Sequence, residues 1–547
     1  MQRRSKNGLF DESKRMAQSS REMKRTGILL AVLLCAGGAL AQETNTATPY
    51  AGIAGGPDQI YAQLTNSLAA QNNAPTETRE LSLQECIDLT IRYNIELQIA
   101  RYQPEISRYN LKSAYGAYDP TAFFTGQHRH SETGPTIFGN SPLPGTQTES
   151  DSFNTTLGGL TPVGTTYSLF GNVNDTVQTQ IGVRTNRNAN GQAGINLTQP
   201  LLRNFWIDSS RLLIRLDKNR VKYDEYGLKL QLMQTLTSLE QAYYDLIYAR
   251  ESVHVQELAA EASDRLVAEN KKKLQVGALA ELDLANAEAQ AAHDRAAIIA
   301  TTSLMGTQER VLKRMITDQI AKWADISIVP TGTLEAPKRT FNRQNSWRKA
   351  LESRPDYQQA KLNVEQAGIQ LKYDFNQMFP ELDVFGTLAY NGSGTVYSGA
   401  LYDIQQQNLP TWTIGGQISM PLTDMGPRNA YKAQKVTVQQ VALTMKAKER
   451  DILIVIDDDI GTLMADYDAV QATHAQRLYE EQALDAEQKK LTNGKSTTYQ
   501  VLLVQRDLTS ARGLEIQALD NYNKDLAKLS FDEGTTLERL NIDFEVK

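Results

Sequence analysis

Residues 411–422 read TWTIGGQISMPL, and up to Met420 polar and apolar positions alternate across the central pair of glycines. A period of two is typical of a β-strand with one apolar and one polar face. The apolar face would hold Trp412, Ile414, Gly416, Ile418 and Met420, and the polar face Thr411, Thr413, Gly415, Gln417 and Ser419. A tilted strand of about ten residues can cross a bilayer, although a half-buried sheet in a soluble protein shows the same alternation.

Similar alternating segments occur next to other prolines. Ile195 and Leu197 share one face of a segment that ends at Pro200, and Val384 and Leu388 follow Pro380. We therefore expect four strands, two in each half of the chain. The strands would meet helices at four junctions, Pro120, Pro200, Pro380 and Pro421. The turn-rich residues 134–151 are expected to form a long loop.

Two long helical segments follow the strands, at residues 209–275 and 426–493. Each would reach about 100 Å at the rise of an α-helix. Their apolar residues step by four and three, which is the seam of packed long helices. The seam residues are Leu232, Leu236, Leu239, Tyr243 and Leu246 in one segment and Ile456, Ile460, Leu463, Tyr467 and Val470 in the other. Because so narrow a stripe cannot stabilise an isolated helix, each needs equally long partners.

Shorter helices can supply those partners. We expect them at residues 83–118, 279–315, 346–378 and 498–529, with Pro104 bending or breaking the first. Two short helices laid end to end match one long helix. This arithmetic predicts a rod of about 100 Å, with strands at one end and glycine turns at Gly277 and Gly494 at the other.

The chain also repeats itself. Residues 93–100 align with residues 353–360 at an offset of 260, and Pro120 then matches Pro380. Because this period is too long for a solenoid, we interpret it as the duplication of a whole unit. We assign a first repeat to residues 81–316, an equatorial linker to 317–344, a second repeat to 345–530 and a C-terminal tail to 531–547.

The start of the chain has the features of a secretory signal. Lys24 and Arg25 precede an apolar run over residues 27–36, and Ala39-Leu40-Ala41 follows it. We expect a signal peptide over residues 1–41 and a flexible leader over 42–80, with Met1, Met16 and Met23 all open as the true start. After Ala41 no apolar run reaches about 18 residues, so membrane contact is expected from β-strands.

Composition excludes several kinds of protein. The 547 residues carry a net charge of −6, which lacks the basic excess that nucleic-acid binding requires. The two cysteines, Cys35 and Cys86, exclude a disulfide scaffold. We find no phosphate-binding loop and no catalytic motif, and His128 and His130 lack a third metal ligand. We therefore expect no enzyme activity, no cofactor and no metal.

Taken together, residues 81–529 resemble the outer-membrane efflux protein family of the TolC type. The resemblance rests on the prolines, the turn glycines and the residues Arg295 and Arg512 behind those glycines. It implies a mainly helical fold with a membrane β-barrel: a homotrimer whose chains share a twelve-stranded barrel and a helical periplasmic tunnel. It also implies an outer-membrane exit duct of a tripartite efflux or type I secretion system. Its partners would be outer-membrane lipid, a periplasmic adaptor and an inner-membrane pump of the RND, ABC or MFS type.

The resemblance also draws attention to the periplasmic mouth. The family commonly carries two acidic residues six and nine positions after the second turn glycine, where this chain has Gln500 and Leu503. The same offsets in the first half give Asp283 and Asn286. Asp283, Asn286 and Gln500 are thus the candidates for a constriction. An acidic residue that favours the start of a helix explains Asp283 equally well.

Two other classes of protein stay open at this point. In a periplasmic coiled-coil adaptor or scaffold, the alternating segments would form a small soluble sheet, and a secreted enzyme would need a catalytic constellation. The transported substrate and the class of pump cannot be read from the sequence.

Overall fold

The computed structural model describes residues 77–138, 141–180, 184–277 and 280–543. The chain divides into two units, Met1–Ala74 and Pro75–Lys547, and the second is described here. The expected signal peptide and leader residues 42–76 lie outside the described residues. Glu77–Leu81 form strand β1, which pairs in parallel with β8, Ile326–Pro330.

The two long helices have the predicted bounds to within one residue. Helix α5 spans the 67 residues Ser209–Gln275, and α11 spans the 68 residues Met425–Thr492. Helix α5 begins where the Asp208 side chain accepts a hydrogen bond from the Arg211 amide, which satisfies one of the free donors of the first turn. All predicted seam residues are buried except Tyr467, which is partly buried, so the seams are confirmed.

Each half of the chain contains two shorter helices in line before its next strand. They are α3 (Leu83–Tyr93) and α4 (Ile95–Tyr115), with the short 3-10 turn η1 (Gly116–Tyr118), and α8 (Arg343–Ser353) and α9 (Pro355–Gln377). The breaks fall at Asn94 and Arg354, which are 260 positions apart. Pro104 was expected to bend or break this helix, and it does not break it, because it lies inside α4. Asn94 starts α4 instead, because its side chain accepts from the Leu97 amide.

Helices α6 (Glu281–Ile316) and α12 (Thr498–Asp532) complete the predicted set. The joint expected to be non-helical contains the single-turn helix α7 (Ile320–Trp323) and strand β8. After α12 the chain makes one more short helix, α13 (Thr536–Arg539).

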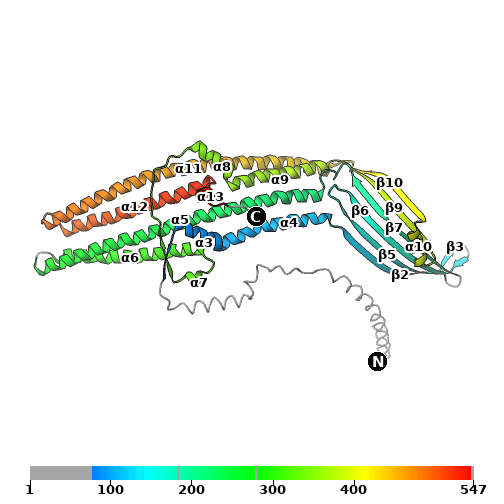
Figure 1. Cartoon of the computed structure of the whole chain (residues 1–547), viewed down its shortest axis with the longest axis horizontal. Helices are drawn as coiled ribbons and strands as arrows, with labels where there is room; N and C mark the ends of the chain where they lie inside the picture. The colour runs from blue at the N-terminus through cyan, green and yellow to red at the C-terminus, as the bar shows by residue number, and fades with distance from the viewer. Residues whose placement is uncertain (1–76, 139–140, 181–183, 278–279, 544–547) are drawn as a thin grey trace, which may run out of the picture. The chain divides into compact units, whose positions relative to one another are not determined.

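The helices of this unit pack side by side in one layer, which can be followed in Figure 1. In the half next to the sheet the packing order is α4, α5, α9 and α11, and in the other half it is α6, α5, α12 and α11. Two apolar cores lie where the short helices meet in line. One surrounds α5 from Leu228 to Ile247, and the other surrounds α11 from Ile452 to Val470.

Across the described ranges, no helix is both long enough and apolar enough to span a membrane.

The sheet has six strands where we expected four. Its order is β10, β9, β7, β6, β5 and β2, and every neighbouring pair is antiparallel. The strands are β2 (Thr121–Thr133), β5 (Thr146–Leu160), β6 (Thr166–Gln180), β7 (Arg184–Pro200), β9 (Glu381–Gly394) and β10 (Leu409–Ser419). The first half therefore supplies four strands, because residues 146–180 form an additional hairpin.

Two smaller elements lie at the outer end of the sheet. Strands β3 (Thr136–Phe138) and β4 (Ser141–Leu143) pair in an antiparallel hairpin, so the expected loop over residues 134–151 is partly ordered. Helix α10 (Tyr397–Gln406) connects β9 to β10.

Candidate functional site

One face of the six-stranded sheet is apolar from edge to edge. The register places Trp412 and Ile195 on either side of Leu388, and Ile195 opposite Leu169 of β6. Leu169 in turn faces Leu157 of β5. Because residues paired across strands share a face, the seven predicted barrel residues all lie on this apolar face. They are Ile195, Leu197, Val384, Leu388, Trp412, Ile414 and Ile418.

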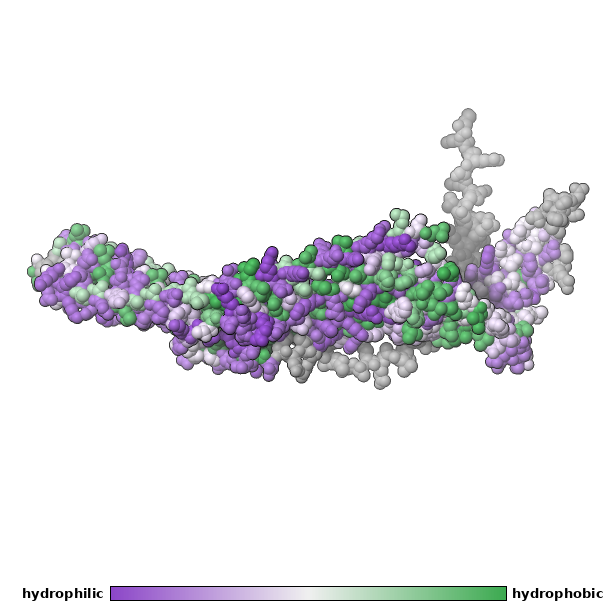
Figure 2. All heavy atoms as spheres, turned by 90° about the horizontal axis from the view of Figure 1, so that it is seen from above, coloured by the Kyte–Doolittle hydropathy of each residue, from purple (hydrophilic) through white to green (hydrophobic). Residues whose placement is uncertain are grey.

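Helix α10 packs over the outer end of this face, where the ring of Tyr397 lies against Phe153, but the part nearer the helix layer is uncovered in the single chain. Trp412 is 72% exposed, Ile414 76% and Ile418 65%. In Figure 2, hydrophobic residues gather where the sheet joins the helices, and the outer end of the sheet is mostly hydrophilic. An apolar surface of this extent marks contact with a membrane or another protein.

The opposite face of the sheet is polar. Amide and hydroxyl side chains dominate it, and several are hydrogen-bonded across strands. Asn391 donates to Thr411 Oγ1 at 2.7 Å, and Ser150 Oγ donates to Asn174 Oδ1 at 2.9 Å. The sheet therefore separates an apolar environment from a wet one, as barrel strands in a membrane do.

Charged residues end the apolar band on its outer side. Asp151 and Asp175 face each other on β5 and β6, and Arg187 binds Asp175 at 2.5 Å. His128 Nδ1 lies 2.6 Å from Asp151 Oδ1 on the same face. On β9 the band from Leu382 to Tyr390 is about 26 Å long at the usual rise of a strand, which is close to the apolar height of membrane barrels.

The four predicted junction prolines lie on the inner side of the band. Pro120 and Pro380 directly precede β2 and β9, Pro200 ends β7, and Pro421 follows β10. Next to them, Arg203 pairs with Glu381, and the Asn376 side chain of α9 bonds the backbone of residues 202 and 204. These contacts fix the ends of the strands to the helix layer.

Two turns that contain glycine lie at the end of the helix layer remote from the sheet. Gly277 and Gly494 have φ values of +73° and +68°, in the left-handed region that favours glycine after a helix. The Gly277 amide donates to the Leu274 carbonyl, and the Gly494 amide to that of Leu491. The turns reverse the chain from α5 into α6 and from α11 into α12.

Each hairpin carries the same ion pair behind its turn. Arg295 of α6 binds Asp264 of α5 at 2.7 Å, and Arg512 of α12 binds Glu481 of α11 at 3.0 Å. The hydrogen bond from Arg512, together with Arg477, lowers the pKa of the Glu481 carboxyl. These contacts explain why both arginines stand at equal distances from their glycines.

The three constriction candidates are distributed over the two hairpins. Asp283 lies in the first turn of α6 and is half-buried, and Asn286 lies one turn later. Gln500 is exposed in the first turn of α12, where its backbone amide donates a hydrogen bond to the hydroxyl of the capping residue Thr497. All three thus lie near the turns, at the end of the layer remote from the sheet.

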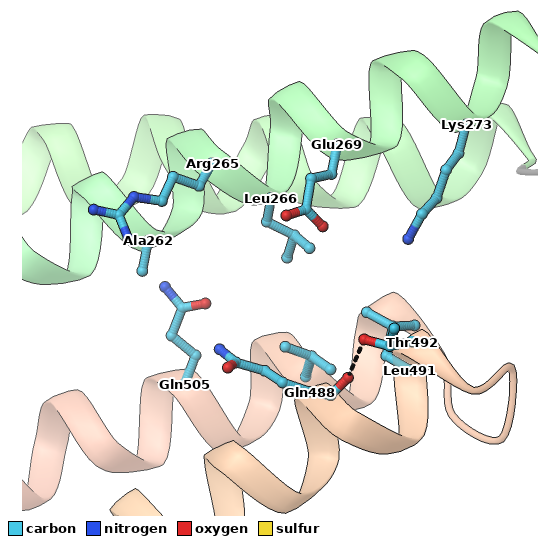
Figure 3. Close-up of a pocket in the computed structure, with 10 residues that line it drawn as sticks. Ala262, Arg265, Leu266, Glu269, Lys273, Gln488, Leu491, Thr492 and Gln505 are labelled. Atoms are coloured by element: carbon cyan, nitrogen blue, oxygen red, sulfur yellow. Dashed lines mark hydrogen bonds between the residues drawn. The ribbon is translucent and has the colours of Figure 1, made fainter.

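A cavity of about 320 Å³ separates the two hairpins near their turns (Figure 3). Arg265, Glu269 and Lys273 line it from α5, and Gln488 lines it from α11. At its inner end Gln505 of α12 crosses to α5, where its side chain donates to the Ala259 carbonyl and to Ser263 Oγ, both at 3.2 Å. The hairpins are joined by this buried amide, and the space between them is polar.

Within the described parts of the chain, no group of three His, Cys, Asp or Glu residues is arranged to hold a metal ion. Some of the charged side chains of the unit link separate helices. Arg354, for example, joins Asp356 and Asp532, each at 2.9 Å.

Sequence reasoning missed strands β5 and β6, and with them part of the apolar face. The missed residues include Phe153, Leu157 and Leu169, which are 47%, 40% and 44% exposed. A signal was present in β6, where Tyr167, Leu169, Gly171 and Val173 alternate with polar residues and Phe170. The turn between the strands was also marked in the sequence by the segment TPVGT. In the structure Gly164 of this segment has a φ of +88°.

Comparison with known proteins agrees with this geometry. Residues 347–531 match the model of the family described as outer membrane efflux protein. The resemblance inferred from the sequence is confirmed by this match. A search of curated proteins finds no relative that matches.

Solved structures show the same fold over most of the chain. The outer-membrane channel OprN aligns with a TM-score of 0.62 at 13% identity, over 83% of this chain and 90% of its own. The outer membrane protein VceC of Vibrio cholerae aligns with a TM-score of 0.59 at 15% identity, over 83% of this chain and 96% of its own. The CmeC channel of Campylobacter jejuni aligns with a TM-score of 0.59 at 15% identity, over 85% of this chain and 90% of its own.

Proposed function

We propose that this chain, which carries an outer membrane efflux protein domain and has the fold of outer-membrane channels, is one subunit of a trimeric exit duct. The sheet would lie in the outer membrane and the helices would extend into the periplasm. Cargo would pass through without chemical change.

The apolar, uncovered face of the sheet carries this proposal. An apolar band about 26 Å long and open to solvent would aggregate in water, but it matches the apolar core of a bilayer. The polar face behind it would line the passage. This band argues against a periplasmic adaptor, because the apolar side of a sheet in a soluble protein must be covered by other parts of the protein.

The edges of the helix layer support assembly. Helix α4 lies at one edge and exposes a seam with spacings of four and three, formed by Ile95, Ile99, Tyr102, Ile106 and Tyr109. Each of these side chains is at least half exposed. At the other edge α11 exposes Val436, Leu443 and Ile454. We infer that α4 of one copy packs against α11 of the next, which closes the layer into a tube.

The family resemblance is the basis for three copies and for further partners. A periplasmic adaptor would dock at the glycine turns. An inner-membrane pump would supply the energy, since the sequence contains no phosphate-binding motif for nucleotide hydrolysis. The element starts also support an ancient duplication. Helices α3 and α8, helices α4 and α9, and strands β2 and β9 all start 260 positions apart.

Cell fractionation followed by reconstitution tests this function. The full-length protein should enter the outer-membrane fraction, require detergent for extraction and form pores in planar bilayers. A water-soluble monomer that forms no pores would contradict the proposal.

A further inference from the structure

The most exposed strands of the sheet are its two edges. Strand β2 pairs only with β5 in the described residues, and β10 pairs only with β9. Nearly every residue of β2 and β10 is exposed, whereas the inner strands are mostly half-buried. Each edge therefore presents a row of free backbone donors and acceptors, which cannot remain open in lipid.

The two edges are complementary in direction. The six strands alternate strictly, so β2 runs away from the helices and β10 returns toward them. Placed side by side, β10 of one copy and β2 of the next would be antiparallel, like every other pair in the sheet. An even number of strands in each copy is what makes this closure possible.

We infer that six strands from each of three copies close into an 18-stranded barrel, with β10 of one copy paired to β2 of the next. This inference rests on the proposed trimer. It replaces the twelve-stranded barrel expected from the family resemblance, because this chain adds the hairpin formed by β5 and β6.

The stagger of the strands is compatible with closure. One row of the sheet joins Thr121 to Thr413, passing through Gly158, Ser168, Asn196 and Thr387. Strand β10 continues from residue 413 to residue 419, six residues beyond this row. A shift of six residues over six strands gives a tilt of about 35°, within the range of closed barrels.

The stagger also predicts the register between copies. If all junctions lie at one level, Ser419 pairs with Thr121 of the next copy, and Thr413 then pairs with Gln127. This register keeps both apolar faces on the same side, since Ile418 meets Ala122 and Ile414 meets Gly126. A slip by one residue would invert one face.

The widths of the two layers agree as well. Four packed helices span about 36 to 40 Å at the usual interaxial distance. Six strands tilted by about 35 to 40° span about the same width, whereas four strands would span only about 25 Å. An 18-stranded barrel therefore continues the helical tube without narrowing, so selection among cargoes would occur at the glycine turns.

Cysteine cross-linking tests the predicted pair in the full-length protein in outer membranes. Cys86 is fully buried, and burial raises the pKa of its thiol to about 12. Cys86 should therefore not react with the reagent, and only the added cysteines should be cross-linked. The variant Thr413→Cys/Gln127→Cys, treated with a short bifunctional thiol reagent, should give covalent dimers and trimers on a denaturing gel. Such a reagent also links the two cysteines if the register between copies differs by two residues, because their side chains are then about 7 to 8 Å apart.

Two matched variants make the outcome decisive. Thr413→Cys/His128→Cys places the thiols on opposite faces and should cross-link far less. Thr413→Cys/Asn172→Cys would cross-link if β6 closed a twelve-stranded barrel without β2 and β5. Cross-linking through Asn172, or a ladder that ends at dimers, in a protein that still forms pores would overturn the 18-stranded barrel alone. A soluble monomer without pores would overturn the proposed function as well.

Discussion

At the scale of single residues, Asp283 is the acidic candidate for the narrow end of the duct. It lies in the first turn of α6, and a trimer would bring three copies of its carboxylate around the passage. We predict that Asp283→Ala lowers the preference for cations several-fold and weakens block by multivalent cations in single-channel records, because a ring of negative charge concentrates cations.

Asn286→Ala and Gln500→Ala test the other two candidates in the same records, and Glu96→Ala, which removes an exposed carboxylate from the first turn of α4, is the matched control. Unchanged conductance, selectivity and block in Asp283→Ala would remove this residue from the constriction and leave it as an ordinary first-turn carboxylate.

Asp520 links stability to pH. Its side chain is buried on α12, and burial raises its pKa to about 6, although Lys524 opposes the shift through a bond of 3.1 Å. A folded-state pKa above the unfolded one means that the folded protein holds the proton more tightly. The contribution to stability is therefore present below about pH 4 and is lost as the pH rises through about 6.

We predict that Asp520→Asn removes this part of the pH dependence. A shift of about two pKa units corresponds to about 3 kcal/mol at most, so the variant should gain about 1 to 3 kcal/mol relative to the wild type between pH 5 and pH 8. Thermal unfolding at both pH values measures the difference, and the exposed Asp507→Asn is the control. Parallel pH profiles for wild type and Asp520→Asn would refute the assignment.

At the scale of elements, the exposed seam of α4 predicts a defined effect on assembly. Ile99 and Tyr102 are 64% and 53% exposed in the single chain, and we expect α11 of the next copy to cover them. Ile99→Asp should shift the purified protein from trimer to monomer, because it removes about 2 kcal/mol of burial at each interface and desolvates a charge.

Size-exclusion chromatography with light scattering in detergent gives the mass. Gln103→Asp is the control, since Gln103 is an exposed α4 residue outside the seam. If both variants stay trimeric, the seam faces solvent rather than a neighbouring copy.

The helices were more predictable than the strands. Residues 209–275 have a helical period over 67 positions without a proline, so α5 was found with its observed bounds. The break at Arg354 was not predicted, since residues 346–378 were expected to form one helix. In the structure Arg354 binds Asp532 from a distant part of the chain, a contact that local patterns do not contain.

Strands β5 and β6 were missed for a physical reason. Each is rich in Asn, Asp, Ser and Thr, and only a few apolar residues such as Phe153, Leu157 and Leu169 mark the face toward lipid. A barrel strand needs apolar side chains on one face only, so the signal in each strand is weak. The family resemblance, which implied four strands, also favoured a loop in this region.

The candidate site was predicted in its parts but not in its extent. The junction prolines, the turn glycines and seven residues of the apolar face were readable from local alternation and spacing. The continuity of that face from Trp412 to Phe124 depends on pairing between strands of different halves, which only the fold supplies.

At the level of the whole molecule, the single chain leaves several surfaces that favour contact with further copies. Within the described residues its sheet has two open edges, its helix layer has two apolar edges, and its apolar band is covered by α10 only at the outer end. All these deficits are removed together when copies join around an axis. Assembly, membrane insertion and the formation of a passage are therefore expected to be one coupled event.

A three-dimensional density map of the protein extracted from outer membranes tests this claim most directly. We expect a three-fold symmetric tube, with helices at one end and a detergent-covered barrel at the other. A map of a lone protomer, with the strands folded back onto its own helices and no detergent belt, would contradict it.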